Sequence, residues 1–117
     1  MTKQVSGAAL ALAIVGLMAN VAWADNRMFY GAGMETCAVW KQSRTGNKVA
    51  TLLLQAWIDG FLSGYNVGSQ ATDFIAPKPE SVAYYPWIDN YCSQNPLSKV
   101  AEAALALKDE LTARARH

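Results

Sequence analysis

Two cysteines restrict the topology of this 117-residue chain more than any other feature of its sequence. Cys37 and Cys92 are the only ones, so a single intramolecular pairing exists. In an oxidising compartment, a disulfide between them closes a long loop and stabilises a small domain by about 4 kcal/mol in the chain-entropy model. The alternatives are a free thiol or a metal pair. The wide spacing does not fit C-x-x-C chemistry and the one histidine, His117, is terminal, so we expect a structural disulfide.

The N-terminus has the pattern of a secretory signal peptide. Lys3 gives a positive start, residues 8–18 form an apolar run, and Ala22-Trp23-Ala24 is a small-x-small cleavage pattern. We therefore expect residues 1–24 to be a signal peptide and residues 25–117 to be one exported domain. The alternative is a single transmembrane anchor, which the cleavage pattern disfavours. After cleavage, no membrane span is expected.

The charge of the expected mature domain excludes two classes of partner. Once Lys3 is removed, Lys and Arg together are as numerous as Asp and Glu. The single basic run, residues 114–117, lies at the end of the chain, where positive charge suits the C-terminal dipole of a helix. A neutral domain without a basic cluster argues against nucleic acid or an anionic membrane as its main partner.

The segment Lys48–Gln70 has the periodicity of an amphipathic helix of about five turns. On a helical wheel, one broad arc holds its larger apolar residues, namely Leu53, Leu54, Trp57, Phe61, Tyr65 and Val67. The opposite arc holds Gln55, Asp59, Ser63 and Asn66. We therefore expect the first arc to face the core and the second to face solvent.

Small residues recur at every fourth position of this segment, at Ala56, Gly60, Gly64 and Gly68. Each glycine inside a helix costs about 1 kcal/mol relative to alanine, so the strip needs a compensating reason. One reason is close approach of another backbone, such as the C-terminal helix or the segment that carries Cys92. The other is a weak helix that opens or rearranges, or a groove for a partner. Close packing is the preferred interpretation, and a switch helix is the alternative.

The segment before this helix contains a start signal and a stop signal. Gly31 and Gly33 argue against regular structure in the N-terminal arm. Thr36 is a candidate N-cap for a short helix over residues 37–43. Gly46 is expected to end that helix in the left-handed conformation.

Two further helices complete the prediction. Residues 84–94 are expected to form a short helix entered at Pro86, and residues 96–116 a last helix with Asn95 as its N-cap. Nothing in the expected mature domain shows the alternating pattern of β-strands. The fold class is therefore all-α, a small four-helix domain stapled from the first helix to the third by one disulfide.

The triplet Trp-Ile-Asp occurs twice, at residues 57–59 and 87–89. Residues two apart lie roughly 200° apart around a helix, so each aspartate points away from its own tryptophan. We expect both tryptophans in the core and both Asp59 and Asp89 in solvent, which argues against a carboxylate pair of the glycosidase kind. The sequence also lacks a nucleophile with a plausible base, a phosphate loop and a metal cluster. We expect no enzymatic activity, no cofactor and no metal site.

Three islands of sequence carry a family resemblance: TCAVW at Thr36–Trp40, AWIDGFLSGYN at Ala56–Asn66, and YCSQNPL at Tyr91–Leu97. In order and approximate spacing they resemble the HdeA/HdeB-like periplasmic acid-stress chaperones. The second island also resembles exported Rap/Tai-type immunity proteins, which neutralise secreted bacterial toxins.

The chaperone resemblance implies a small periplasmic α-helical protein, often a homodimer at neutral pH, that loosens in strong acid and binds unfolding clients. It matches Cys37 and Cys92 to the positions of the single disulfide. The aromatics that we expect to form the core or bind clients are Trp40, Trp57, Phe61, Trp87 and Tyr91. The expected partners are unfolded or acid-denatured periplasmic proteins. Under the immunity alternative, the partner is one specific toxin.

Overall fold

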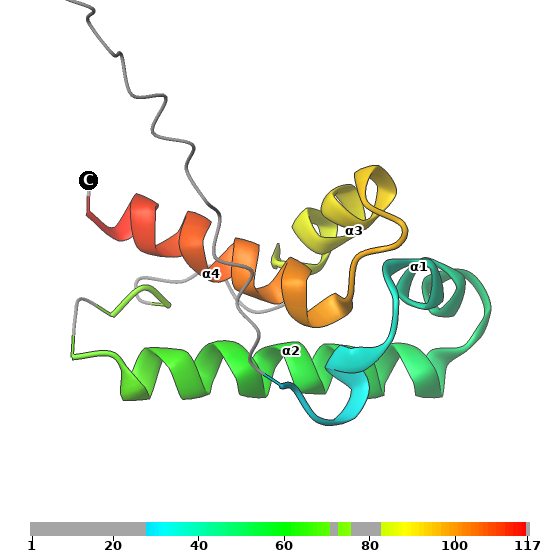
Figure 1. The fold of residues 1–117 in the computed structure, drawn as a ribbon, viewed down its shortest axis with the longest axis horizontal. Helices are drawn as coiled ribbons and strands as arrows, with labels where there is room; N and C mark the ends of the chain where they lie inside the picture. The colour runs from blue at the N-terminus through cyan, green and yellow to red at the C-terminus, as the bar shows by residue number, and fades with distance from the viewer. Residues whose placement is uncertain (1–27, 71–72, 76–82, 117) are drawn as a thin grey trace, which may run out of the picture.

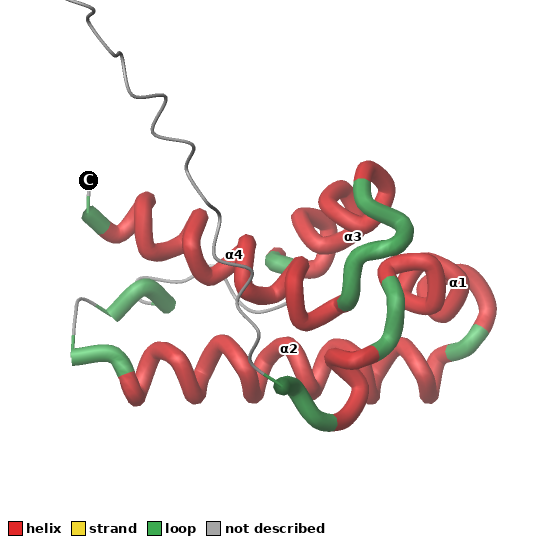
Figure 2. Tube along the Cα trace, in the orientation of Figure 1, coloured by secondary structure: helices red, strands yellow, loops and turns green. Residues whose placement is uncertain are grey.

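The computed structural model describes residues 28–70, 73–75 and 83–116. The expected signal peptide and its cleavage site lie outside the described residues. In the described part, the chain forms no β-strand but one short 3-10 helix and four α-helices (Figures 1 and 2). The elements in chain order are η1 (Gly31–Met34), α1 (Cys37–Gly46), α2 (Lys48–Gly68), α3 (Tyr85–Gln94) and α4 (Val100–Ala115). The predicted all-α, four-helix class is confirmed.

The start of α1 is confirmed and its predicted stop is wrong. Thr36 is the N-cap of α1, and its side chain accepts a hydrogen bond from the third backbone N–H of the helix. Gly46 is the last residue of α1 and is not left-handed, because among the described residues only Gly31 has a positive φ. Asn47 serves instead as the C-cap of α1 and the side-chain N-cap of α2. The two helices are therefore joined by one residue.

α3 begins as predicted, with Pro86 in its first turn, but α4 begins later than predicted. Asn95 is the C-cap of α3 and not the N-cap of α4. The turn that follows docks on the start of α1, since the Ser98 carbonyl accepts the Cys37 N–H at 2.7 Å. As a consequence, Leu97, which lies in the range predicted for the last helix, is outside α4 and 90% exposed.

The predicted disulfide is confirmed. The Sγ atoms of Cys37 and Cys92 are 2.04 Å apart, and the bond joins α1 to α3 in the fully buried centre of the domain. α1 packs on one end of α2, α4 packs along α2, and α3 packs against α1 and α4 (Figure 1). The largest fully buried side chains are Trp40, Ile58, Leu62, Ile88, Leu107 and Val100.

The buried face of α2 is turned relative to the predicted one. Its fully buried residues are Leu54, Ile58 and Leu62, one helical turn apart. Leu53 and Val67, which were predicted in the core arc, are 62% and 86% exposed. Because apolar residues surround this helix on most sides, its wheel does not select one face.

Close backbone packing occurs at η1 and not along α2. A Cβ added at Gly33 would lie 2.3 Å from the ring of Trp57, and Gly31 has a φ of +80°. Apart from the backbone of α2 itself, a Cβ added at Gly60, Gly64 or Gly68 would meet no atom of the described residues within 4 Å. The preferred close-packing interpretation of the α2 glycines is therefore wrong within one chain. The prediction that the N-terminal arm is irregular is also wrong at residues 31–34, which form η1.

None of the helices in the described segments combines the length and the apolar character needed to cross a membrane.

Candidate functional site

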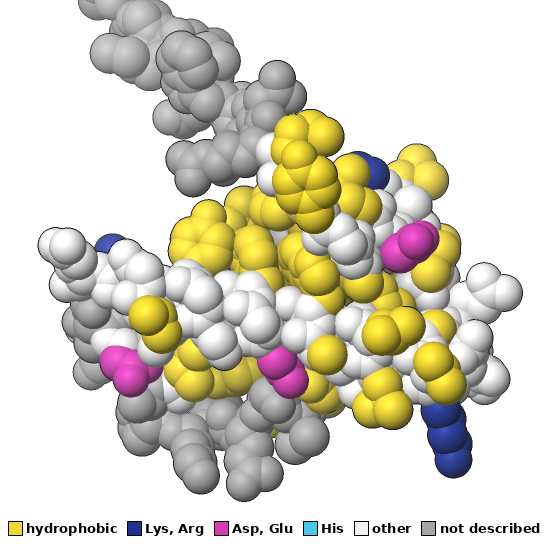
Figure 3. Space-filling view, turned by 90° about the horizontal axis from the view of Figure 1, so that it is seen from below, with side chains coloured by type: hydrophobic (Ala, Val, Ile, Leu, Met, Phe, Trp, Pro, Cys, Tyr) yellow, Lys and Arg dark blue, Asp and Glu magenta, His cyan; other side chains and the backbone are white. Residues whose placement is uncertain are grey.

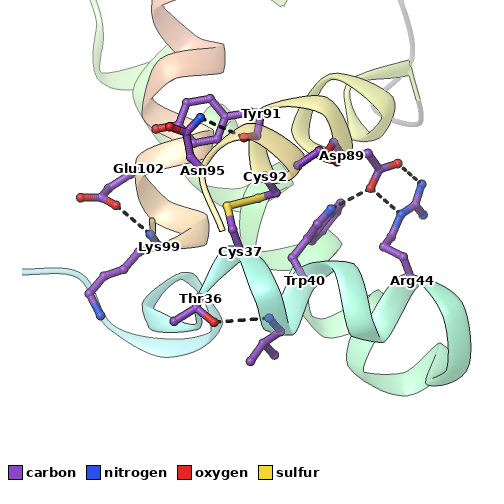
Figure 4. Close-up of a disulfide and its surroundings, with 12 residues drawn as sticks. Thr36, Cys37, Trp40, Arg44, Asp89, Tyr91, Cys92, Asn95, Lys99 and Glu102 are labelled. Atoms are coloured by element: carbon purple, nitrogen blue, oxygen red, sulfur yellow. Dashed lines mark hydrogen bonds and ion pairs between the residues drawn. A yellow bond between two sulfur atoms is a disulfide. The ribbon is translucent and has the colours of Figure 1, made fainter. Parts of the chain in front are cut away.

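Asp89 links α3 to α1 beside the disulfide (Figure 4). Its Oδ1 atom accepts hydrogen bonds from the Trp40 indole N–H at 2.7 Å and from Arg44 Nε at 3.0 Å. Its Oδ2 atom pairs with Arg44 Nη2 at 2.8 Å, which makes the arginine contact bidentate. The prediction that Asp89 is a solvated residue is wrong, because it holds two helices together.

The Asp89 link is insensitive to ordinary alkali. The hydrogen bond to Asp89 raises the pKa of Arg44 above its usual value, against a smaller opposing effect of burial. The pKa of Arg44 is higher in the folded chain than in the unfolded chain. The contribution of Arg44 to stability is therefore complete below its ordinary pKa and is lost only as the pH rises through the raised pKa of the folded chain. The Arg44 side of the ion pair therefore stays charged at every accessible pH.

Asp59 provides a second link, between α2 and α3. The Tyr85 hydroxyl donates a hydrogen bond to Asp59 Oδ2 at 2.8 Å. The other oxygen, Oδ1, is buried without a hydrogen-bond partner among the described residues, and so is the hydroxyl of Tyr84. Burial, followed by the charges of Asp59 and Asp73, raises the pKa of Tyr84. Asp59 is thus a partly buried structural carboxylate, which contradicts its predicted place in solvent.

In each Trp-Ile-Asp triplet the isoleucine is the buried residue. Ile58 and Ile88 are fully buried, and each aspartate and tryptophan flanks its isoleucine on opposite sides. The predicted separation of each aspartate from its own tryptophan is consistent with this arrangement. The prediction that both aspartates lie in solvent was wrong, because the side of the helix that carries each aspartate faces another helix.

Tyr84 gives a prediction about alkaline stability. Replacing Tyr84 by phenylalanine removes a buried, unpaired hydroxyl and is expected to stabilise the fold by about 1 kcal/mol at neutral pH. Its raised folded pKa means that, above about pH 10, the unfolded chain loses a proton that the folded chain keeps. Stability therefore falls as pH rises through this range, and less steeply in Tyr84→Phe. Urea unfolding of the wild type and of Tyr84→Phe at neutral pH and above about pH 10 tests this prediction.

The matched control is Tyr30→Phe, because the side chain of Tyr30 is 85% exposed. It is expected to change neither the neutral stability nor the alkaline slope. An unchanged alkaline slope in Tyr84→Phe would contradict the assignment.

The predicted client-binding aromatics lie in three separate places. Trp40 is fully buried beside the disulfide. Trp57 and Phe61 stack on α2 with centroids 5.1 Å apart, and Phe29 packs against both rings. Trp87 and Tyr91 stack on α3 with centroids 5.8 Å apart. These residues form no single aromatic surface, and the four on α2 and α3 are only partly exposed.

A surface that the sequence analysis missed lies on the solvent side of α2, and we call it the outer face of α2. It contains no charged residue and consists of exposed positions only (Figure 3). Its members are Val49, Leu52, Leu53, Ala56, Gly60, Ser63, Gly64 and Val67. The two charged residues of α2, Lys48 and Asp59, lie at the edge of this face or beyond it. In the sequence, this face could have been recognised by the absence of charged residues from it over about five helical turns.

Within the described segments, no group of three His, Cys, Asp or Glu residues is placed to hold a metal ion. Comparisons with protein-family models, curated proteins and solved structures found no match to this chain. The HdeA/HdeB-like assignment and the Rap/Tai alternative therefore remain predictions from the three sequence islands.

Proposed function

We propose that this protein is a periplasmic holdase chaperone that strong acid activates and that binds unfolding clients through apolar surface. The observation that carries the proposal is how α3 is attached. Asp59 holds it to α2 through Tyr85, and Asp89 holds it to α1 through Trp40 and Arg44. The Cys37–Cys92 disulfide is a covalent attachment beside them. Acid weakens the first two attachments and leaves the third intact.

The size of the acid effect fits loosening and not complete unfolding. A hydrogen bond to a charged group contributes about 1.5–3 kcal/mol, and a neutral one about 0.5–1.5 kcal/mol. Replacing the charged acceptor by a neutral one at Asp59 or Asp89 would weaken these hydrogen bonds, and less at Asp89, whose side chain is 38% exposed and screened by solvent. Small domains have about 5–15 kcal/mol of stability, so this loss shifts the equilibrium toward opening. The positive charge that the domain gains in acid adds repulsion.

The surface uncovered by movement of α3 is apolar. Ile88 of α3 belongs to the same buried core as Trp40 on α1 and Val100 on α4, the two helices against which α3 mainly packs. The disulfide keeps α3 next to α1, so the opened chain stays compact and can close again when the carboxylates ionise. Such a reversible apolar surface suits the capture and release of unfolding proteins.

The test is client protection as a function of pH. The purified protein should keep malate dehydrogenase, used as a model client, soluble at about pH 2.5, below the usual pKa of carboxylates, and not at neutral pH. Asp89→Asn and Asp59→Asn imitate the protonated carboxyls. They should move the onset of protection toward neutral pH.

The matched control is Asp109→Asn on α4, because that carboxylate is 68% exposed and its salt bridge is to the adjacent Lys108. It should leave the onset of protection unchanged. Absence of protection at either pH would refute the holdase proposal. A tight, stoichiometric partner at neutral pH would then favour the immunity-type binding module.

A further inference from the structure

A cavity of about 580 Å³ lies between the C-terminal ends of α2 and α4, at the left of Figure 1. Three segments line it: the last turn of α2 with the residue that follows, Phe74, and the last two turns of α4 with the residue that follows. Sites that hold small molecules in proteins measure about 300–1,000 Å³. This cavity is therefore large enough for a small organic molecule.

Two aromatic residues, Tyr65 and Phe74, line this cavity. Phe74 is 7% exposed and belongs to the core. The ring of Tyr65 lies between two neighbours, since it packs on Phe61 with centroids 5.0 Å apart and Lys108 Nζ lies 5.2 Å from its centre. These contacts fix both rings in place, and preformed apolar surface of this kind binds the apolar part of a ligand.

Two glycines of α2 keep the cavity open. Gly64 and Gly68 line it, and a Cβ added at either would meet no atom of the described residues within 4 Å, apart from the backbone of α2. Glycine weakens a helix relative to alanine, and no packing contact within the chain compensates for this here. A side chain at either position would occupy space that a ligand needs, which accounts for the two glycines where close packing does not.

Both charged residues that line the cavity are cationic. Lys108 contributes an ammonium and Arg116 a guanidinium, and the lining contains no Asp or Glu. Arg116 forms no ion pair with any described residue. Lys108 pairs with Asp109, which lies outside the lining, but an ammonium has three hydrogens to donate. The cavity therefore offers two donors that suit an anion.

Two features oppose an anion at this place, and both are weaker than the cations. The C-terminal end of each helix carries about half an elementary negative charge. At equal dielectric, a full charge at about 3 Å acts about four times as strongly as half a charge at about 6 Å. The carboxylate of Asp109 is screened by solvent, because it is 68% exposed. An anion that contacts the guanidinium and the ammonium directly is therefore favoured.

We propose that this cavity binds a small aromatic carboxylate, with its carboxylate on Lys108 and Arg116 and its ring against Tyr65 and Phe74. A guanidinium binds a carboxylate through two parallel hydrogen bonds, which fixes the orientation of the ligand. An inorganic anion would leave the aromatic lining uncovered, and a neutral aromatic molecule would not use the cations. The site shares no residue with the attachments of α3, so this inference goes beyond the proposed holdase function and does not depend on it.

The test uses 3-phenylpropionate as the probe at neutral pH, without any client protein. Backbone amide shifts in nuclear magnetic resonance should saturate and should be largest at the C-terminal ends of α2 and α4. The neutral 3-phenylpropanamide, which lacks the charge, and acetate, which lacks the ring, should each bind about 10-fold more weakly or less well still. No saturable binding of the probe, or equal binding of the probe and the amide, would overturn the proposal.

The end of a protein chain could supply the same chemistry. Acetyl-Gly-Gly-Phe with a free C-terminal carboxylate should bind no more tightly than 3-phenylpropionate, because the cavity matches a small molecule in size. Binding of this peptide about 10-fold more tightly than the probe would overturn the assignment of a small molecule.

Gly68→Leu tests the location of the site. Side chains of a helix lean toward its N-terminus, so this leucine would lie beside Gly64 in the cavity. It should weaken binding of the probe about 10-fold with unchanged far-ultraviolet circular dichroism, since the position is open. The matched control is Gly60→Leu, the same substitution at an equally open glycine of α2 outside the lining. Wild-type affinity in Gly68→Leu, or equal weakening by both variants, would contradict the site.

Lys108→Met and Arg116→Gln test the cations. Each should weaken binding of 3-phenylpropionate about 10-fold and leave binding of the amide unchanged. Methionine retains an apolar chain against Tyr65, so the first variant removes the charge and little packing. The control is Lys41→Met, which removes one positive charge from an exposed position on α1. Equal weakening by this control would show a general effect of charge and would overturn the proposal.

Discussion

Removing the Cys37–Cys92 disulfide is expected to lower the free energy of unfolding by about 4 kcal/mol. The bond joins residues 55 apart in sequence, so it restricts a large part of the unfolded chain. Domains of this size have only about 5–15 kcal/mol of stability, and a loss of this size leaves many of them partly unfolded. Urea denaturation of the Cys37→Ala/Cys92→Ala double variant measures the effect.

The control for this experiment is the wild-type protein unfolded under reducing conditions. It isolates the loss of the crosslink, because the double variant also loses two fully buried sulfur atoms and should be somewhat less stable than the reduced wild type. A double variant within about 1 kcal/mol of the oxidised wild type would show that the crosslink contributes little. The proposed function would then lose the covalent attachment that keeps α3 beside α1 in acid.

Gly33→Ala is expected to destabilise the fold by about 3 kcal/mol through overpacking. The added Cβ would lie 2.3 Å from the indole ring of Trp57, which is far inside contact distance. The ring is not free to move away, because its N–H donates to the Tyr30 carbonyl at 2.7 Å and its face stacks on Phe61. Thermal and urea unfolding, followed by circular dichroism, measure the loss.

The same substitution at Gly60 is the matched control and has the opposite expected sign. Nothing lies within 4 Å of a Cβ at Gly60, and this residue is inside α2. Gly60→Ala should therefore raise stability by about 1 kcal/mol through helix propensity, at protein concentrations where the chain is monomeric. Destabilisation by Gly60→Ala in the monomer would restore the close-packing interpretation of this glycine. A neutral Gly33→Ala would contradict the packing of η1 against Trp57.

Helix positions were largely predictable, and the exception at Asn95 has a cause far away in sequence. Thr36 and Pro86 marked helix starts correctly because capping and proline geometry act within one turn. Asn95 followed by a proline satisfies the same rule for a helix start, yet it ends α3. The carbonyls of the turn after Asn95 accept hydrogen bonds from N–H groups at the start of α1. This competing interaction comes from residues that are far away in sequence.

The candidate sites were predicted less well than the helices. Asp59 and Asp89 were placed in solvent, because a helical wheel contains no information about neighbouring helices. Tyr85 is 26 residues from Asp59 along the chain, and Trp40 is 49 residues from Asp89. The outer face of α2 was missed for the same reason, since its apolar residues looked like core until α4 and η1 were seen to cover the other side.

The sequence by itself determined the all-α class, most helix bounds and the one disulfide, because periodicity, capping and a single cysteine pair are properties of short segments or of counting. The tertiary structure alone decided which face of α2 is buried, which glycines are needed and which carboxylates are paired. Those outcomes depend on side chains that meet in space from distant positions. In a helix that is apolar on nearly every side, many orientations satisfy the local pattern equally, so only packing against η1, α1 and α4 selects one.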